Sequence, residues 1–140
     1  MTNVAVIYYS STGNAHALAQ AVAEGARQSG AEVRLRRVAE LAPAEAIDAN
    51  PAWRAHADST AHVPVASLED HRGAIVVAPG YTDDAVSAAG GNPYGTAHPS
   101  GAGLPGERTL QAARHQGRRL ARIAALLAST SVAAGGSVGR

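Results

Sequence analysis

The chain has 140 residues and a formal net charge of +1, with 46% hydrophobic and 16% charged residues. This composition is typical of one small globular domain and excludes an intrinsically disordered chain. The absence of cysteine excludes disulfides, thiolate catalysis and Cys-ligated metals, and the small net charge gives no electrostatic reason to expect nucleic acid or an acidic membrane as partner.

The first third of the chain predicts a βαβ unit. Residues 4–9 (VAVIYY) are β-branched and aromatic, which is typical of a strand buried on both faces. A helix is predicted over Ala15–Ser29 because small and apolar residues recur there every four positions. Asn14 is expected to cap this helix and Gly30 to follow its end. Alternation over Glu32–Val38 predicts a second, more exposed strand, joined by a right-handed crossover.

The rest of the chain is less regular. Three prolines within Leu41–Asp70 predict loops and short helices, and Gly73–Ala78 (GAIVVA) predicts a third buried strand. The Gly- and Pro-rich segment Asp83–Gly106 is expected to be a long loop, and Glu107–Ala128 a second long helix. Its predicted apolar face contains Leu110, Ala113, Gly117, Leu120, Ala124 and Leu127. The small, glycine-rich residues 129–140 predict a mobile tail.

The turn after the first strand, Ser10–Ala15 (SSTGNA), has the composition of an anion site. Backbone N–H groups at a helix start have no intrahelical partner, and the helix dipole is positive there. Hydroxyls of Ser10, Ser11 and Thr12 add donors, and Gly13 allows close backbone approach. The spacing matches neither a nucleoside-triphosphate loop nor a dinucleotide fingerprint. We therefore expect a phosphomonoester such as that of FMN, the alternative being a plain strand-to-helix turn.

Several segments, taken in order, resemble one family. VAVIYYSSTGN looks like the flavodoxin phosphate signature, and AVAEGA and GAEVRLRRV are similar to its WrbA branch. Downstream, APGYTD, then GGNPYG at Gly90–Gly95 and ARHQGRR at Ala113–Arg119 are similar to the same branch. The chain thus resembles the WrbA family of FMN-dependent NAD(P)H:quinone oxidoreductases. The resemblance implies a shortened flavodoxin-like three-layer α/β/α fold with a parallel sheet over residues 1–128.

The family pattern is interrupted between Asp70 and His71. Family members carry two further βα units here, including the loops that flank the flavin ring and a Trp that lines the substrate site. At roughly 30 residues per βαβ unit, on the order of 60 residues are missing. We expect Ala74–Ala78 to fill the slot of the family's third strand, which gives the strand order 2-1-3.

The resemblance also implies a cofactor site and a reaction. FMN would bind through its phosphate at Ser10, Ser11, Thr12, Gly13, Asn14 and Ala15. A family histidine near the flavin maps to His71, for which an exposed turn histidine is the alternative. NAD(P)H would be the co-substrate and a quinone the substrate of a two-electron reduction, in a homo-oligomer. No catalytic residue is assigned, and the scattered histidines predict no metal site.

Three interpretations of function remain open. In the first, the chain is the quinone reductase that the resemblance implies. In the second, it is a non-catalytic, degenerate relative with weak or no FMN binding, because the ring-flanking loops are missing. In the third, it is an anion-binding module without a redox role. A run of about 18 apolar residues is absent, so no membrane span is expected and a cytoplasmic protein is predicted.

Overall fold

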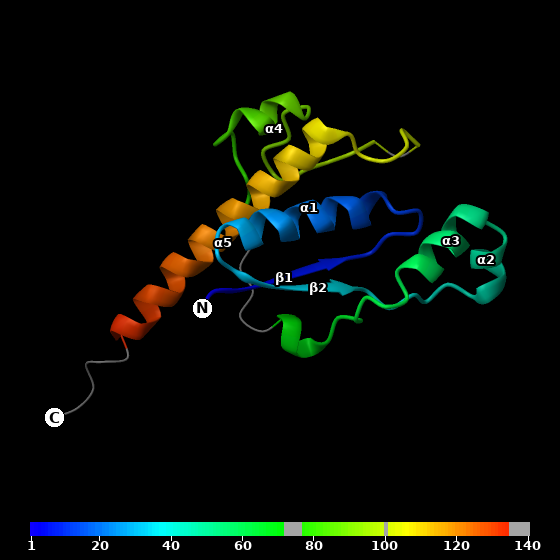
Figure 1. Cartoon of the computed structure of the whole chain (residues 1–140), viewed down its shortest axis with the longest axis horizontal. Helices are drawn as coiled ribbons and strands as arrows, with labels where there is room; N and C mark the ends of the chain where they lie inside the picture. The colour runs from blue at the N-terminus through cyan, green and yellow to red at the C-terminus, as the bar shows by residue number, and fades with distance from the viewer. Residues whose placement is uncertain (72–76, 100, 135–140) are drawn as a thin grey trace.

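The computed structural model describes residues 1–71, 77–99 and 101–134. The elements in chain order are β1 (Asn3–Tyr8), α1 (Asn14–Gln28), β2 (Glu32–Arg37), α2 (Ala44–Asp48), α3 (Pro51–Ser59), η1 (Leu68–His71), α4 (Asp84–Ala88) and α5 (Glu107–Ala134). Figure 1 shows α1 and α5 on one side of the strands, η1 on the other, and α2 and α3 beyond one end of the sheet. Among the helices in these ranges, none combines the length and apolar character needed to cross a membrane.

The predicted βαβ unit is confirmed. Strands β1 and β2 pair in parallel, with Val4 opposite Val33 and Val6 opposite Leu35, and α1 forms the crossover between them. Every second residue of β1 is buried, which is how a strand presents one face to a covering helix. Ala5 and Ile7 on the other face are only half-buried, so the expected burial on both faces is wrong. The α/β class with a parallel sheet is therefore confirmed.

The third predicted strand cannot be placed in this sheet. Most of Gly73–Ala78 falls on residues 72–76, which lie outside the described residues, so the order 2-1-3 is not confirmed. At the outer edge of β2, the segment that follows α3 forms one parallel bridge. There the Arg37 N–H donates to the Pro64 carbonyl at 3.0 Å, and the Ala66 N–H donates to the Arg37 carbonyl at 2.8 Å.

The core lies between the sheet and the two long helices. It contains Val4, Val6, Tyr8, Ala19, Ala23, Ala26, Ala31, Val63 and Ala121. Because most of the helix positions are alanine, α1 and α5 can approach until their backbones touch. A Cβ added to Gly25 would lie 1.8 Å from the Arg114 carbonyl oxygen, and one added to Gly117 would lie 1.9 Å from the Val22 carbonyl oxygen.

The ends of α1 differ partly from the prediction. The N-cap is Gly13, with φ of 102°, and Asn14 is the first helical residue, so the predicted Asn14 cap is wrong. Glycine adopts this positive φ without the Cβ clash that asparagine would meet, and it therefore sets the helix start. The predicted C-terminal glycine is confirmed, because Gly30 has φ of 80° and its N–H donates to the Arg27 carbonyl at 2.9 Å.

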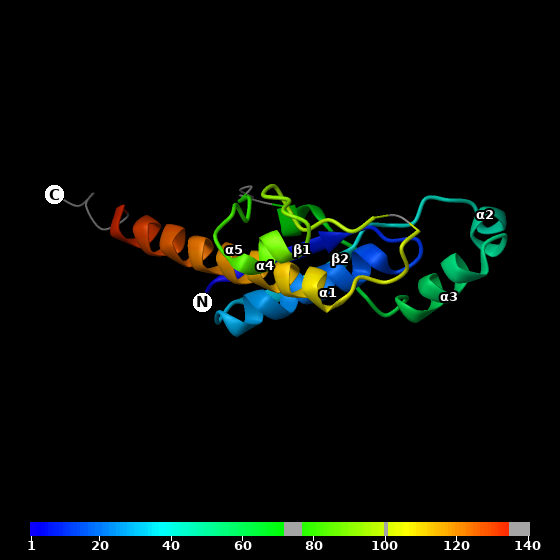
Figure 2. The same cartoon turned by 90° about the horizontal axis from the view of Figure 1, so that it is seen from above.

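The second half contains one helix that the sequence did not predict. Within the expected loop, α4 begins after Asp83, whose carboxylate accepts a hydrogen bond from the Ala85 N–H at 2.9 Å. The last helix continues to Ala134, beyond the predicted end at Ala128. Its later turns project past α1 in both views (Figure 1, Figure 2), so Leu127, expected on the apolar face, is 49% exposed. Of the predicted mobile tail over residues 129–140, residues 129–134 belong to this helix, and residues 135–140 lie outside the described residues.

Candidate functional site

The loop between β1 and α1 brings most of the predicted phosphate residues to one point. Figure 1 shows it at the carboxyl end of β1, where α1 begins. Gly13 is buried and its N–H donates to Ser10 Oγ at 3.0 Å, whereas Thr12 is exposed. Ser11, Asn14 and Ala15 are half-buried around the same turn. The six residues from Ser10 to Ala15 thus form one compact strand-to-helix turn.

This turn has the chemistry that a phosphate group needs. The first backbone N–H groups of the 15-residue helix α1 lack intrahelical acceptors, and they share the turn with three hydroxyl side chains. A Cβ on Gly13 would meet His56 Nδ1 at 3.5 Å and Leu104 Cδ2 at 3.8 Å, so the backbone is held between α3 and a later loop. The residues present therefore fit the phosphate end of FMN.

A tyrosine–histidine cluster borders the turn. The Tyr8 hydroxyl and His16 Nδ1 are 2.6 Å apart, and the His16 and His56 rings meet edge-on with centroids 5.4 Å apart. Tyr8 and His16 come from the consecutive elements β1 and α1, whereas His56 comes from α3, which is distant in the sequence. Their spacing follows no motif, so sequence reasoning did not single them out.

Burial controls the protonation of this cluster. Burial is the main cause that lowers the pKa of His16, and the nearby charges of His56 and His62 lower it further. Burial likewise lowers the pKa of His56. The pKa of Tyr8 is raised by burial, although the Arg37 charge opposes the shift. Both imidazoles are therefore held toward the neutral form, and an anion bound nearby would favour their protonated form.

These shifts predict that the protein loses stability as the solution becomes acidic. A histidine with a lowered folded-state pKa stabilises the fold at high pH, and this contribution is lost as pH falls below its ordinary value of 6.5. We expect the melting temperature to fall between about pH 7.5 and about pH 5.5. The double variant His16→Gln/His56→Gln should reduce that slope. A residual dependence of the melting temperature on pH should remain, because burial also lowers the pKa of His115. If the double variant kept the full pH dependence of the wild-type protein, His16 and His56 would not be its cause.

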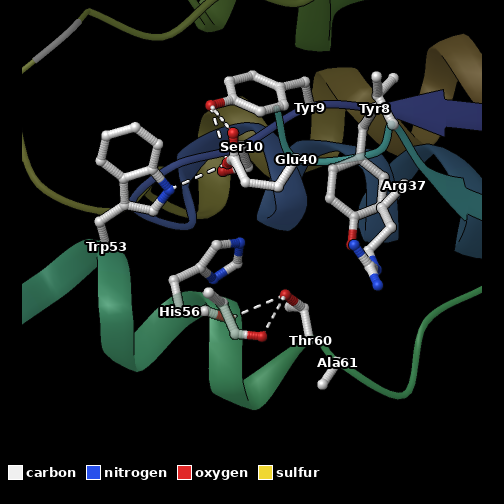
Figure 3. A pocket seen from close by; sticks show the side chains of 11 residues that line it. Tyr8, Tyr9, Ser10, Arg37, Glu40, Trp53, His56, Thr60 and Ala61 are labelled. Atoms are coloured by element: carbon white, nitrogen blue, oxygen red, sulfur yellow. Dashed lines mark hydrogen bonds between the residues drawn. The ribbon is translucent and has the colours of Figure 1, made fainter. Parts of the chain in front are cut away.

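A cleft of about 110 Å³ opens beside the turn (Figure 3). Its walls are the ends of β1 and β2 and one side of α3, and Ser10 lies at its edge. The Glu40 carboxylate accepts hydrogen bonds from the Tyr9 hydroxyl at 3.1 Å and from Trp53 Nε1 at 3.2 Å. A hydrogen bond from the Ala42 N–H is the main cause that lowers the Glu40 pKa. The carboxylate therefore stays ionised and fixes both aromatic side chains.

His71 lies apart from this region. It ends η1, which Figure 1 shows beside the sheet and away from the start of α1. The neighbouring Asp70 pairs with Arg36 at 3.4 Å and Arg34 at 4.0 Å, and these contacts hold η1 against β2. The His71 side chain is outside the described residues, so its role near a flavin stays a prediction.

The sequence is similar to known flavodoxin-like proteins. The flavodoxin family model matches residues 6–57, which include the phosphate turn, α1, β2 and most of α3. A protein named NAD(P)H dehydrogenase (quinone) from Deinococcus radiodurans is 28% identical over 192 residues, covering 89% of this chain and 96% of the relative. Proteins of the same name from Afipia carboxidovorans and Archaeoglobus fulgidus are 48% and 51% identical over 82 and 53 residues.

The coverage of these relatives shows that the chain is short. The Afipia and Archaeoglobus alignments cover 57% and 38% of this chain but only 39% and 28% of the relatives. The Deinococcus alignment, at 192 residues, is longer than the 140-residue chain, so part of that relative has no counterpart here. The resemblance expected from the sequence is confirmed, because the chain is similar over part of its length to the flavodoxin family and to proteins named NAD(P)H dehydrogenase (quinone).

Proposed function

We propose that the chain is an FMN-dependent NAD(P)H:quinone oxidoreductase that holds the FMN phosphate at Ser10–Ala15. The observation that carries this proposal is the hydroxyl-rich turn at the start of α1, in a chain whose relatives are named for quinone reduction. When bound, a flavin supplies the two-electron chemistry between a nicotinamide and a quinone, so the protein need only bind and orient its ligands.

The residues of the turn have distinct tasks in this proposal. Ser10 Oγ accepts from the Gly13 N–H, so its own O–H remains able to donate to a phosphate oxygen. The backbone N–H groups of the first turn of α1 would donate to the same phosphate. Ala15 lacks a hydroxyl and would contribute only its N–H. The enzyme would be homo-oligomeric, as the family resemblance implies, and cytoplasmic, as expected from the sequence.

A second candidate function is a non-catalytic protein with weak or no FMN binding. It is favoured by the part of the Deinococcus relative that has no counterpart in this chain. Phosphate contacts alone position a ligand, whereas contacts with the ring supply much of the remaining affinity. If the missing part carried the ring contacts, the family ancestry would persist without the activity.

A flavin titration separates the two candidates. The purified chain is examined for visible absorbance, and FMN is then titrated while flavin fluorescence is followed. A yellow protein, or saturable quenching at low micromolar FMN, supports the oxidoreductase and leads to steady-state assays with NADH, NADPH and a quinone. A colourless, folded protein that leaves FMN fluorescence unchanged supports the non-catalytic candidate.

A further inference from the structure

The cleft beside Ser10 has an aromatic rim. Tyr9 and Trp53 line it from the end of β1 and from α3, and the Glu40 carboxylate bonds to both. Tyr9 is 48% exposed, so its ring is available to solvent at the cleft mouth. Trp53 is half-buried. Aromatic rings that are held in place by a shared acceptor lose little freedom when a planar ligand packs against them.

The inner part of the cleft presents hydrogen-bond donors. Figure 3 shows the Arg37 guanidinium and the His56 ring on either side of the same space. Arg37 is anchored there because its Nε donates to the Val63 carbonyl at 2.9 Å. The buried Thr60 hydroxyl donates to the His56 carbonyl at 2.8 Å, which fixes the end of α3. A ligand that carries carbonyl oxygens therefore has the acceptors that match the donors of this cleft.

The volume limits the size of the group that enters. At about 110 Å³ the cleft is open to solvent and somewhat smaller than a closed cavity of about 150 Å³ that admits benzene. Because the cleft is open on one side, one end of a planar ring system can enter it while the remainder stays outside. The cleft also begins at Ser10, so a ring held there lies next to the phosphate turn.

We propose that this cleft binds a planar ring bearing carbonyl oxygens, with the ring against Tyr9 and Trp53 and the oxygens toward Arg37 and His56. Two ligands of the proposed function carry this chemistry, namely the pyrimidine end of the flavin and a quinone. The inference rests on the proposed function and gives it a ring site formed by residues of this chain. That site lies at the end of β1 and β2. It does not need the βα units that family members carry at the position between Asp70 and His71.

Binding measurements on matched variants test this assignment. Calorimetry is carried out with FMN, riboflavin, menadione and inorganic phosphate on the wild-type chain and on Trp53→Leu, Trp53→Phe and Tyr94→Leu. Tyr94 is the control because it is 86% exposed and does not line the cleft. Trp53→Leu should lower the affinity for the ring ligand about tenfold and leave the affinity for phosphate unchanged. Trp53→Phe should retain most of the affinity for the ring ligand. If the affinity for riboflavin depends on Trp53, the cleft binds the flavin end. If only the affinity for menadione depends on Trp53, the cleft binds the quinone.

The outcomes separate this inference from the proposed function. If wild-type protein binds FMN, and neither FMN, riboflavin nor menadione depends on Trp53, the ring site is refuted while the flavin function stands. If the wild-type chain binds none of these ring compounds, both are refuted.

A measurement on the unmodified chain covers the case in which Trp53→Leu does not fold. Trp53 is the single tryptophan, so acrylamide quenching of its fluorescence reports on the cleft alone. Saturating riboflavin or menadione should lower the quenching constant several-fold, and an unchanged constant would refute the site.

Discussion

Replacing Gly117 with alanine is expected to destabilise the fold by about 1–3 kcal/mol, the usual cost of forcing an extra group into a packed interface. A Cβ at this position would lie 1.9 Å from the Val22 carbonyl oxygen, which is backbone and cannot rotate away. Helix propensity alone predicts the opposite, a gain of about 1 kcal/mol for alanine in a helix interior. The clash should dominate because α1 and α5 would have to separate along their contact. Urea denaturation followed by circular dichroism measures the change.

Two further variants test the cause of this effect. Gly25→Ala should destabilise similarly, because its Cβ would lie 1.8 Å from the Arg114 carbonyl oxygen on the facing helix. The double variant should cost less than the sum, since one separation of the helices relieves both clashes. Gly95→Ala is the control, as no atom of the described residues lies within 4 Å of its Cβ position. A Gly117→Ala protein more stable than wild type would show that the helices do not approach this closely.

The second large effect is expected at the proposed phosphate turn. Gly13→Ala should weaken FMN binding by about tenfold or more, because a residue with a Cβ pays roughly 1–2 kcal/mol in a left-handed conformation and the turn would relax away from it. Gly13 has φ of 102° and begins α1, so its backbone direction decides where the first N–H groups point. FMN fluorescence titration gives the affinity, and a thermal melt gives the stability.

Gly30→Ala is the matched control for this prediction. Gly30 also has a positive φ, 80°, and lies at the opposite end of α1, where no residue in the described part of the chain comes within 4 Å of its Cβ position. Both variants should lower the melting temperature, but only Gly13→Ala should weaken FMN binding. Equal FMN affinities for the two variants would contradict phosphate binding at the turn.

The sequence by itself determined the β1–α1–β2 unit and the position of the turn Ser10–Ala15, the proposed phosphate site. These features depend on local patterns: a continuous apolar run for β1, four-residue periodicity for α1, and a glycine after the last helical turn. The residues of the turn are contiguous, so their proximity needs no long-range contact. The N-cap was mistaken because capping preference favours asparagine, whereas the sharp turn into α1 requires the positive φ of Gly13.

Only the tertiary structure decided the surroundings of the turn. His56 joins Tyr8 and His16 because α3 folds back over the ends of the strands, and no sequence spacing encodes that contact. The same fold brings Trp53 to Glu40. Periodicity identified only part of the inner face of α5, since it included the buried Ala113 but missed the buried Ala112 and Ala121. Burial was decided by the backbone contact at Gly25 and Gly117, because the distance between two helices depends on both faces at once.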